Sequence, residues 1–418
     1  MRFNPQTPSD APLVFATVGL PARGKSYLAR RLLRYVSWLG YQTKIFNVGA
    51  YRRRLLDGPH EHDFFSPRNA EGNALREKMA VNALEDLKNW IRNGGDVGIY
   101  DATNSSRSRR ARIVSEAAQV GARVVFVESI TDDPELIEKN IADKRAHSPD
   151  YVGQPADRAI RDFRLRMAHY EESYETLAEE GLSYIKVIDV GRQVIANRVH
   201  GFLSSNAVYF LMNLHLVRRP VLLTRHGESE FNAAGRIGGD SELTDRGEAY
   251  ARSLRAYLDS EFGDEEVVVW TSTLRRTRRT AELLGRDYTE WRALDEIEAG
   301  ICNGLTYAEI KERYPEDYQS RSEDKLAYRY PRGESYLDVI ERLSALIIEI
   351  ERQRKPLLIV AHQAVVRVLF AYFTHAPLRQ CPFIEVPLHA VMKVTPSSFG
   401  CDEEIRYLGE SAPESSSS

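Results

Sequence analysis

The segment between Leu13 and Leu39 constrains the fold of this chain more than any other stretch. Leu13 to Val18 is almost wholly apolar, which is typical of a strand buried on both faces of a parallel sheet. The next eight residues, Gly19-Leu20-Pro21-Ala22-Arg23-Gly24-Lys25-Ser26, fit the pattern G-x-x-x-x-G-K-[ST]. Residues 27–39 then carry leucine and valine at helical spacing. A strand, a glycine-containing loop and a helix in this order predict an α/β domain with a phosphate-binding loop.

The loop between this strand and helix has the residues that binding of a nucleoside triphosphate requires. Backbone N–H groups of the loop and of the helix start can surround phosphate oxygens, and Lys25 can reach the β- and γ-phosphates. Ser26 can ligate Mg²⁺. Asp101 closes the apolar strand 97–100, so it is suited to the Mg²⁺ shell or to activating a hydroxyl. Asp101 or Asn104 also suits the N-cap of the following helix, and that interpretation is compatible with the functional one.

Alternating strands and helices fill the rest of the first half, which predicts a mostly parallel sheet with helices on both faces. Among these elements we expect a long helix over 156–180, a connecting helix over 191–205 and a last strand over 208–216. The hinge is expected directly after that strand. The chain would then consist of two domains, 1–216 and 217–418.

Histidines and arginines of the first half have two different interpretations. His60 and His62 lie in a loop-like segment, and a pair of histidines can bind a metal ion. Because no further ligand is evident in the sequence, we expect both to be exposed to solvent. Dispersed arginines such as Arg76 and Arg109 are each typical of a solvated surface. Together they indicate an anionic second substrate.

Two apolar strands in the second half each lead to a histidine. These are His226, within Arg225-His226-Gly227, and His362. Open α/β sheets bind their ligands at the carboxyl ends of strands. The carboxylate-rich turn 294–300 and the arginine-rich segment 275–279 would add an acid and a cation. Together they fit a phosphoryl-transfer site with a nucleophile, a general acid and a charge clamp. Taken alone, His226 could equally be a strand-end histidine bonded to backbone.

Composition argues against several classes of function. The net charge is −3 over 418 residues and no apolar run could span a bilayer, so we expect no nucleic-acid or membrane role. Three cysteines without metal-ligand spacing are typical of free thiols in a reducing compartment. With no secretory signal evident at the start, the expected location is the cytoplasm. The serine-rich tail from about 411 is expected to be disordered.

Longer motifs in both halves match one known arrangement. In the first half they are GLPARGKS, the YRR triplet, DATNSSRSRR and SPDY. In the second half they are RHGESEFNAAGRIGGD, WTSTLRRT, LDEIEAG, YPRGESY and AHQAVVR. From about Leu13 to Tyr407 the chain resembles the 6-phosphofructo-2-kinase/fructose-2,6-bisphosphatase family. The resemblance implies an α/β fold class, with a P-loop kinase domain followed by a histidine phosphatase domain of the phosphoglycerate mutase type.

In the second domain the resemblance implies a fructose-2,6-bisphosphatase that needs no metal or other cofactor. His226 would be the nucleophile that forms a phosphohistidine, and Glu296 would protonate the leaving sugar hydroxyl. The residues holding the transferred phosphoryl group would be Arg225, Arg276 and His362. The positions that match contacts to the bisphosphate are Asn232, Gly238, Tyr307, Arg321, Lys325, Tyr336, Gln363 and Arg367. Arginines and histidine would supply the charge stabilisation.

In the first domain the resemblance implies ATP-dependent phosphorylation of fructose 6-phosphate at O2, with Lys25 and Asp101 as catalytic residues. Ser26 and Asp101 would hold Mg²⁺. The positions for ATP are Gly19, Gly24, Lys25, Ser26, Asn140 and Arg145. The positions for fructose 6-phosphate are Arg76, Thr103, Arg109, Arg166 and Tyr170.

Two positions of the first domain depart from the family pattern. Thr131 stands where the family commonly has cysteine, and Arg145 stands where it has a lysine that contacts ATP phosphate. Arginine keeps the charge but differs from lysine in shape and hydration. Lys144, the preceding residue, is an alternative. These departures leave open a protein that is predominantly a fructose-2,6-bisphosphatase with a weak or lost kinase.

Two other interpretations are also open. One is a phosphatase or mutase for other sugar phosphates, fused to an unrelated P-loop kinase; the matches at Arg321, Lys325 and Tyr336 argue against it. The other is a metabolite-sensing pseudoenzyme, which the presence of His226 and Glu296 disfavours. The resemblance also implies a homodimer.

Overall fold

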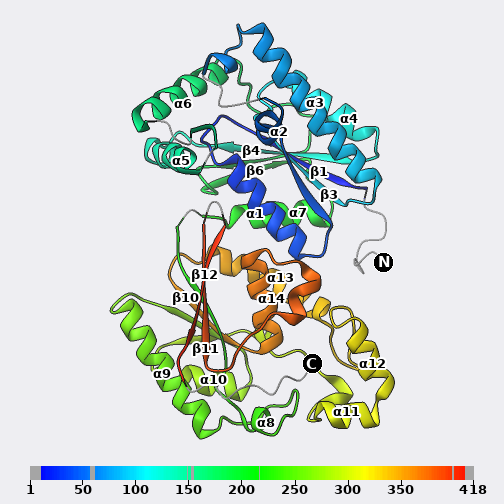
Figure 1. Ribbon diagram of the computed structural model, residues 1–418, viewed down its shortest axis with the longest axis vertical. Coiled ribbons are helices and arrows are strands. Elements are labelled where there is room, and N and C mark those ends of the chain that lie inside the picture. The colour runs from blue at the N-terminus through cyan, green and yellow to red at the C-terminus, as the bar shows by residue number, and fades with distance from the viewer. Residues whose placement is uncertain are drawn as a thin grey trace. The chain divides into compact units, whose positions relative to one another are not determined.

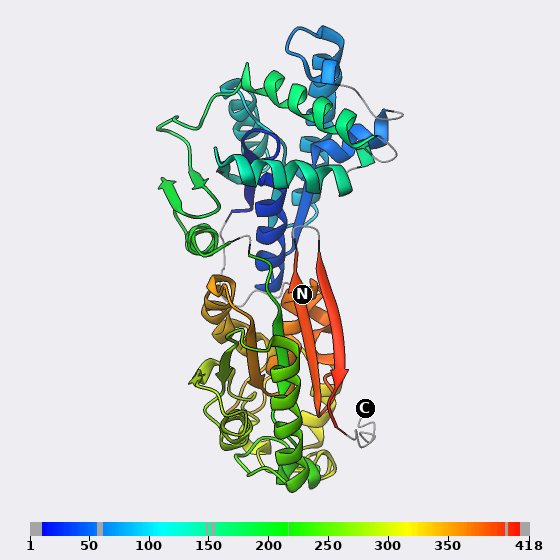
Figure 2. The same cartoon turned by 90° about the vertical axis from the view of Figure 1, so that its left-hand side faces the viewer.

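The computed structural model describes most of the chain. The described residues are 11–56, 62–147, 149–151, 155–215, 217–397 and 400–409. The chain divides into two compact units, 1–216 and 217–418, and each contains one six-stranded sheet. Helices lie on both faces of each sheet (Figure 1 and Figure 2). His60 and the tail from 411 lie outside the described residues.

The sheet of the first unit is parallel except at one edge. Its spatial order is β2-β3-β1-β4-β5-β6, and among these described strands only β6 runs antiparallel to its neighbour. The strands are β1 (Leu13–Val18), β2 (Thr43–Asn47), β3 (Val97–Asp101), β4 (Arg123–Ile130), β5 (Tyr184–Ile188) and β6 (Gln193–Asn197). β1 is buried at every position, because β3 and β4 flank it and helices cover both faces. The predicted mostly parallel α/β sheet is confirmed.

Side-chain caps fix where several helices of this unit begin. The helices are α1 (Lys25–Trp38), α2 (Val48–Leu55), η1 (His62–Phe65), α3 (Ala70–Arg92), α4 (Arg107–Ala118), α5 (Pro134–His147), η2 (Pro149–Tyr151), α6 (Ala156–Glu171) and α7 (Phe202–Met212). Asn69 caps α3 by accepting from the Gly72 N–H at 2.7 Å. Ser106 caps α4. Since Ser106 has this role, Asp101 and Asn104 are not needed as caps, and the Asp101 carboxylate is available for another function.

The end of the first unit differs from the sequence prediction. A strand was expected over 208–216 and a helix over 191–205, and both expectations are wrong: β6 precedes α7. The buried residues of α7 include Leu203, Ala207, Phe210 and Leu211. These residues follow one another at intervals of four, three and one positions, which places them on one face of a helix. Burial of this face stabilises the helix more than the β propensity of the apolar run stabilises a strand. β6 forms because β5 offers an open edge, which no local pattern reveals.

The helix expected over 156–180 ends at Glu171, because the residues after it turn back towards a buried carboxylate. Glu128 on β4 is fully buried. It accepts hydrogen bonds from Thr176 Oγ1 at 3.0 Å and from the Leu177 N–H at 3.2 Å. A buried carboxylate left without such donors would cost far more than the helical hydrogen bonds lost in the turn.

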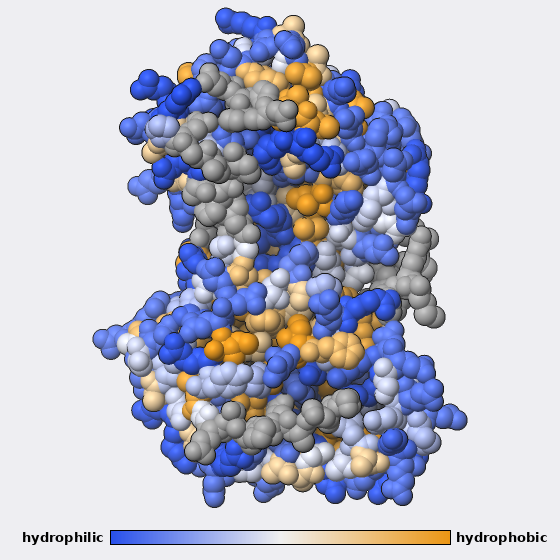
Figure 3. All heavy atoms as spheres, in the orientation of Figure 1, coloured by the Kyte–Doolittle hydropathy of each residue, from blue (hydrophilic) through white to orange (hydrophobic). Residues whose placement is uncertain are grey.

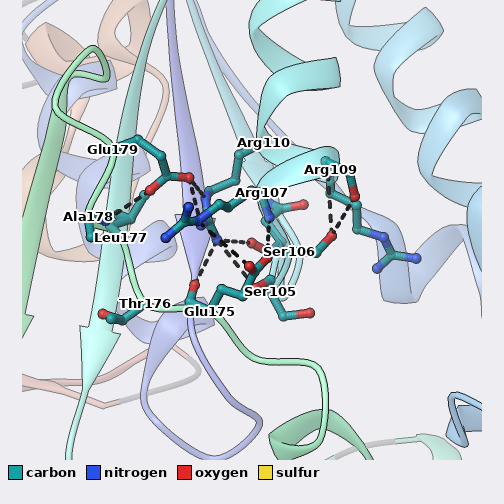
Figure 4. A network of polar contacts seen from close by, with 12 residues as sticks. Ser105, Ser106, Arg107, Arg109, Arg110, Glu175, Thr176, Leu177, Ala178 and Glu179 are labelled. Carbon is teal, nitrogen blue, oxygen red and sulfur yellow. Dashed lines mark hydrogen bonds and ion pairs between the residues drawn. The ribbon is translucent and has the colours of Figure 1, made fainter.

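Arg110 of α4 ties this turn to the segment after β3 (Figure 4). The side chain is fully buried, and its Nε donates to Glu179 Oε1 at 2.7 Å. One terminal nitrogen donates to the carbonyl oxygens of Asn104, Ser105 and Glu175 at 3.2, 3.3 and 2.9 Å. The segment it holds begins at Asp101, so Arg110 helps to fix the edge of the sheet where the first unit carries its predicted site.

Replacing Arg110 by methionine is expected to lower the free energy of unfolding by about 3 kcal/mol, because it leaves buried carbonyl groups and one carboxylate without their donor. Urea unfolding followed by circular dichroism measures the change. Arg192→Met is the control, since Arg192 is 77% exposed and forms only a surface ion pair with Asp189. An equal loss in both variants would contradict a structural role for Arg110.

The sheet of the second unit has the order β12-β11-β7-β10-β8-β9, with four parallel strands and an antiparallel pair at one edge. The strands are β7 (Val221–Arg225), β8 (Val268–Thr271), β9 (Tyr288–Glu290), β10 (Leu357–Ala361), β11 (Ala390–Pro396) and β12 (Cys401–Tyr407). β7 and β10 are wholly buried neighbours, and Arg225 pairs with Ala361 in their register. The residues after both strands therefore lie at one edge.

The helices of the second unit carry most of the remaining chain. They are α8 (Glu230–Ala233), α9 (Asp245–Phe262), α10 (Arg275–Glu282), η3 (Arg292–Leu294), η4 (Gly300–Cys302), α11 (Tyr307–Arg313), α12 (Pro315–Glu323), α13 (Tyr336–Arg352), α14 (Gln363–Thr374) and η5 (Leu378–Phe383). No helix among the described residues is both long and apolar enough to cross a membrane. The face drawn in Figure 3 is largely hydrophilic, with small separated groups of apolar residues.

Candidate active sites

His226 and His362 meet at the edge where β7 and β10 end. The His226 N–H donates to the Ala361 carbonyl at 3.0 Å, and the two imidazole centroids are 5.1 Å apart. The two residues are 3% and 0% exposed. The two histidines are neighbours because β7 and β10 pair in parallel and in register. This pairing brings residues 136 positions apart to the same end of the sheet.

Hydrogen bonds determine which nitrogen of His226 can react. Its Nδ1 lies 2.7 Å from the Gly227 carbonyl, which can only accept, so Nδ1 carries the proton. Arg276 Nε donates to Nε2 at 3.0 Å, so Nε2 carries the lone pair. Burial lowers the pKa of His226 well below its ordinary value, and the charges of Arg276 and Arg225 lower it further. The side chain is therefore a neutral imidazole at physiological pH, with its lone pair on Nε2.

This shift predicts that His226 stays neutral as the pH falls from 8 to 6. An unperturbed histidine with a pKa near 6.5 would be about three-quarters protonated at pH 6. Titration of ¹⁵N-labelled histidine side chains by NMR measures the fraction, and His226→Gln identifies the signal. A His226 signal that titrates near pH 6.5 in the free protein would contradict the prediction.

His362 offers a nitrogen that has no hydrogen-bond partner. Its Nε2 lies 2.8 Å from Ser272 Oγ, which in turn lies 2.6 Å from Thr277 Oγ1. Its Nδ1 is buried, and no group in the described part of the chain bonds to it. Burial and the charge of Arg276 lower the pKa of His362 well below its ordinary value. A buried nitrogen without a partner is costly, so this atom is suited to a ligand oxygen.

The other residues predicted for this site line one pocket in front of the histidines. They are Arg225, Asn232, Gly238, Arg276, Glu296, Tyr307, Arg321, Lys325, Tyr336, Gln363 and Arg367, together with His226 itself. They come from the end of β7 and from loops and helices between 225 and 367, and the fold brings them all together. A pocket with this many cations fits a ligand with more than one negative group.

A cluster of three cations, Arg321, Lys325 and Arg367, gives the pocket a second anion-binding position. Arg321 donates to Tyr330 Oη at 2.9 Å and to Tyr307 Oη at 2.8 Å. Arg367 donates to the Ile384 carbonyl at 2.7 Å, which fixes its orientation. Burial, together with the charges of Arg321 and Arg367, lowers the pKa of Lys325 to about 8. Because packing holds these three cations close together, they repel one another. A bound anion would reduce this repulsion.

Glu296 is held in the pocket by its own turn. Its Oε1 accepts from the Ile297 N–H at 2.9 Å. Arg342 of α13 donates to the carbonyl oxygens of Asp295 and Glu296 at 2.6 and 3.3 Å, and to Glu334 Oε1 at 2.9 Å. Arg342 is a positioning residue that no sequence pattern singles out, because its role depends on contact between α13 and a distant turn.

The loop before α1 has the backbone shape that binding of phosphates requires. Gly24 has φ 89°, and no side chain caps the helix that follows it. A Cβ on Gly19 would lie 2.5 Å from the Ser129 carbonyl, so only glycine fits there. Lys25 Nζ donates to the Leu20 carbonyl at 2.5 Å, and burial lowers the pKa of Lys25 to about 7. The uncapped helix start and the buried amine fit a phosphate group.

Asp101 ends β3 beside this loop and is held by two donors. Its carboxylate accepts from Asn47 Nδ2 at 2.5 Å and from Thr17 Oγ1 at 3.1 Å. Ser26 follows Lys25 in the first turn of α1. A hydroxyl and a carboxylate next to a phosphate loop are oxygen ligands of the kind that Mg²⁺ prefers, so the residues present fit this ion.

The two candidate residues of α5 differ in their surroundings. Lys144 is close enough to Asp101 and Lys25 to interact with both charges, and burial lowers the pKa of Lys144. Arg145, at the next position, is exposed. Asn140 donates to the Ala22 carbonyl at 2.8 Å, which attaches α5 to the phosphate loop. Lys144 and Asn140 therefore lie on the side of the phosphate loop, and the prediction that Arg145 contacts ATP stays a prediction.

Three arginines predicted for the sugar phosphate gather around Phe65 and Tyr170. The guanidinium of Arg166 lies 3.7 Å from the Phe65 ring centre, and that of Arg76 lies 5.8 Å from the ring centre of Tyr170. Although burial raises it, the charges of Arg166, Arg76 and Arg109 together lower the pKa of Tyr170. The Thr103 carbonyl accepts from the Gly19 N–H at 3.1 Å, which places Thr103 beside the phosphate loop. Four of the five predicted positions thus lie together, and Thr103 lies beside the phosphate loop.

Comparisons with known proteins find a family model for each half of the chain. The model of the 6-phosphofructo-2-kinase family matches residues 4–218, and that of the histidine phosphatase superfamily (branch 1) matches 221–404. Among curated proteins, the 6-phosphofructo-2-kinase/fructose-2,6-bisphosphatase of Gallus gallus is 45% identical over 97% of this chain and 86% of its own length. The chain belongs to the 6-phosphofructo-2-kinase/fructose-2,6-bisphosphatase family.

Two further relatives have the same kind of name. The 6-phosphofructo-2-kinase/fructose-2,6-bisphosphatase 4 of Homo sapiens is 45% identical over 97% of this chain and 87% of its own length. The 6-phosphofructo-2-kinase/fructose-2,6-bisphosphatase of Arabidopsis thaliana is 48% identical over 95% of this chain, but the match covers 54% of that protein. The chain thus spans about half the length of the plant relative.

In this member of the 6-phosphofructo-2-kinase/fructose-2,6-bisphosphatase family, the structure adds residues to the predicted kinase site. Arg52 is 5% exposed and forms an ion pair with Asp150, and Asp150 lies 3.6 Å from Arg166. The YRR and SPDY motifs were the available signal for these two residues. No sequence pattern indicated Phe65. An aromatic residue in a loop can be recognised as a stacking partner of an arginine only when its neighbours in the structure are known.

Proposed function

We propose that this protein controls fructose 2,6-bisphosphate through two opposing reactions. One is hydrolysis of its 2-phosphate at His226. The other is transfer of the γ-phosphoryl group of ATP to O2 of fructose 6-phosphate in the first unit. Family membership supports both activities, and the match to a kinase model implies use of ATP. A weak kinase, a pseudoenzyme and an unrelated fusion are not favoured.

The observation that carries the hydrolase proposal is the state of His226. Its Nε2 lone pair is directed to Arg276 and its proton is on Nδ1. In the proposed reaction Nε2 attacks the 2-phosphorus, the P–O2 bond breaks, and Glu296 gives a proton to O2 of the leaving fructose 6-phosphate. Arg225, Arg276 and Nδ1 of His362 would hold the phosphoryl oxygens. Water then attacks the phosphorus, Glu296 accepts a proton from the water, the P–Nε2 bond breaks, and phosphate leaves with the lone pair returned to Nε2 of His226.

The cationic cluster supports the choice of substrate. A sugar carrying a second phosphate would place it against Arg321, Lys325 and Arg367, while the 2-phosphate meets His226. Substrates with one phosphate would leave one of the two anion positions without a ligand. Hydrolysis of a panel of sugar monophosphates and bisphosphates tests this choice. We expect fructose 2,6-bisphosphate to have the highest kcat/KM in the panel.

For the kinase, the proposed roles follow from the buried charges around the phosphate loop. Ser26 and Asp101 would hold Mg²⁺, which neutralises phosphate charge when bound. Lys25, with Lys144 nearby, would stabilise the transferred phosphoryl group, and Asp101 is held by Asn47 and Thr17. Arg76, Arg166 and Tyr170, with Thr103 and Arg109, would bind fructose 6-phosphate.

The experiment that tests the proposed function measures both reactions on one purified sample. Formation of fructose 2,6-bisphosphate from MgATP and fructose 6-phosphate is followed in one assay, and release of its 2-phosphate in the other. We expect both to be detected. A protein that hydrolyses the bisphosphate but never forms it would contradict the kinase part alone.

A further inference from the structure

Three side chains at the junction of η1 and α6 form a cluster that the proposed function does not use. They are His62 and Asp63 of η1 and His169 of α6. His62 Nδ1 lies 3.4 Å from His169 Nε2 and 3.2 Å from Asp63 Oδ1. The two imidazole rings are stacked, with centroids 5.7 Å apart and planes 25° apart. The three ligand atoms all lie within 4.8 Å of one another.

The spacing of these atoms is that of ligands around one ion. Nitrogen and oxygen ligands lie 2.0–2.2 Å from zinc, so two ligands of a tetrahedral site are about 3.3 Å apart. The distances of 3.2 and 3.4 Å from His62 Nδ1 are close to this value. A histidine–histidine hydrogen bond alone would be long at 3.4 Å.

The second nitrogen of His169 is a further observation in favour of a ligand. His169 Nδ1 is buried, and within the described ranges no hydrogen bond reaches it. Its nearest carboxylate is Glu172 Oε1, at 3.8 Å. Metal-bound histidines usually donate their other N–H to a carboxylate, which fixes the ring and raises its basicity. An ion on Nε2 would make Nδ1 such a donor, and a small side-chain movement would bring Glu172 to it.

We propose that His62, Asp63 and His169 bind a divalent transition-metal ion of the zinc type. The set of two imidazoles and one carboxylate favours Zn²⁺ or Co²⁺ over Mg²⁺, which prefers oxygen ligands. The side chains of His62 and His169 are 29% and 20% exposed, so an ion can reach them from solvent. Three protein ligands leave the fourth position to water.

The position of this site links it to the sugar-phosphate residues. Phe65 ends η1 and lies under Arg166, which α6 carries one turn before His169. An ion bound to both elements would fix Phe65 against Arg166 and Tyr170. The free-energy cost of ordering these side chains when the sugar phosphate binds would then be smaller. This consequence for the kinase rests on the proposed function, whereas the metal site does not.

Isothermal titration of metal-free, full-length protein with Zn²⁺ in excess Mg²⁺, without nucleotide, tests the site. His62→Gln and His169→Gln are each expected to lose one binding equivalent or to weaken it at least about tenfold. His200→Gln, an exposed histidine of the same unit, is expected to keep it. The comparison is needed because His226 and His362 could bind zinc elsewhere. Zn²⁺ should also raise the melting temperature of the wild type more than that of the two ligand variants.

Cobalt provides a second measurement that does not depend on enzyme activity. Co²⁺ in a four-coordinate site should give visible absorption bands in the wild-type protein that both ligand variants lack. Circular dichroism and urea unfolding serve as the check that the variants fold, since His62, His169 and His200 lie in the first unit. Equal zinc stoichiometry, affinity and cobalt spectra in all four proteins would overturn the proposal. A wild-type protein that binds zinc at this site but shows no kinase activity would contradict only the proposed function.

Discussion

With His226 replaced by alanine, hydrolysis of fructose 2,6-bisphosphate is expected to fall by at least about 10⁴-fold, as it does when an enzyme loses its nucleophile. The reason is that no other described group of the pocket has both a free lone pair and the position of Nε2. Its neighbour His362 uses Nε2 for Ser272. Formation of the bisphosphate in the first unit should continue. The variant would therefore accumulate product that the wild type removes.

Labelling gives the direct measurement. Wild-type protein mixed with bisphosphate carrying ³²P at position 2 should gain an acid-labile phosphohistidine within one turnover, and His226→Ala should gain none. His375→Asn is the matched control, because His375 is an exposed residue at the C-cap of α14 whose φ of 56° asparagine tolerates. Labelled His226→Ala protein would show that a different residue is the nucleophile.

Replacing Lys25 by methionine is expected to lower kinase turnover by about 10²–10³-fold or more, the loss seen when one group that stabilises transition-state charge is removed. Methionine suits this test because Lys25 is 9% exposed and its amine is already partly neutral, with a pKa of about 7. An apolar side chain of similar length at such a position leaves stability nearly unchanged. Hydrolysis at His226 should be unaffected.

The measurement is the rate of fructose 2,6-bisphosphate formation, carried out in the His226→Ala background so that the product survives. Lys44→Met serves as control, since Lys44 is an exposed lysine of the same unit whose amine lies over the Phe46 ring at 5.2 Å. If Lys25→Met and Lys44→Met reach comparable rates, Lys25 does not stabilise the transferred phosphoryl group.

Local sequence signals were enough for the elements on which both sites are built. An apolar strand before GLPARGKS and another before RHG specify where a phosphate loop and a histidine lie, because strand burial and glycine conformations act over a few residues. The same reasoning failed at 191–216, where β6 depends on an edge offered by β5 and α7 on the packing of one helix face.

Similarity to a family also has a physical limit. The resemblance places the nucleotide-contacting lysine at the position of Arg145, and in the structure the neighbouring Lys144 also interacts with the charge of Asp101, while Arg145 is exposed. Successive residues of a helix point about 100° apart, so a shift of one position changes which side chain reaches a site. The orientation of α5 is decided by contacts such as Asn140 with Ala22.

By itself the sequence determined two α/β domains, the phosphate loop at Lys25 and the position of His226 at a strand end, since each rests on a short motif with its flanking strand. Only the tertiary structure decided which distant residues share a site. Sheet register brings His362 to His226, and packing of η1 on α6 brings His169 to His62, 107 residues away. The histidines of each pair are far apart along the chain. They become neighbours because packing brings together residues at any sequence separation, whereas secondary-structure propensity acts only over a few residues.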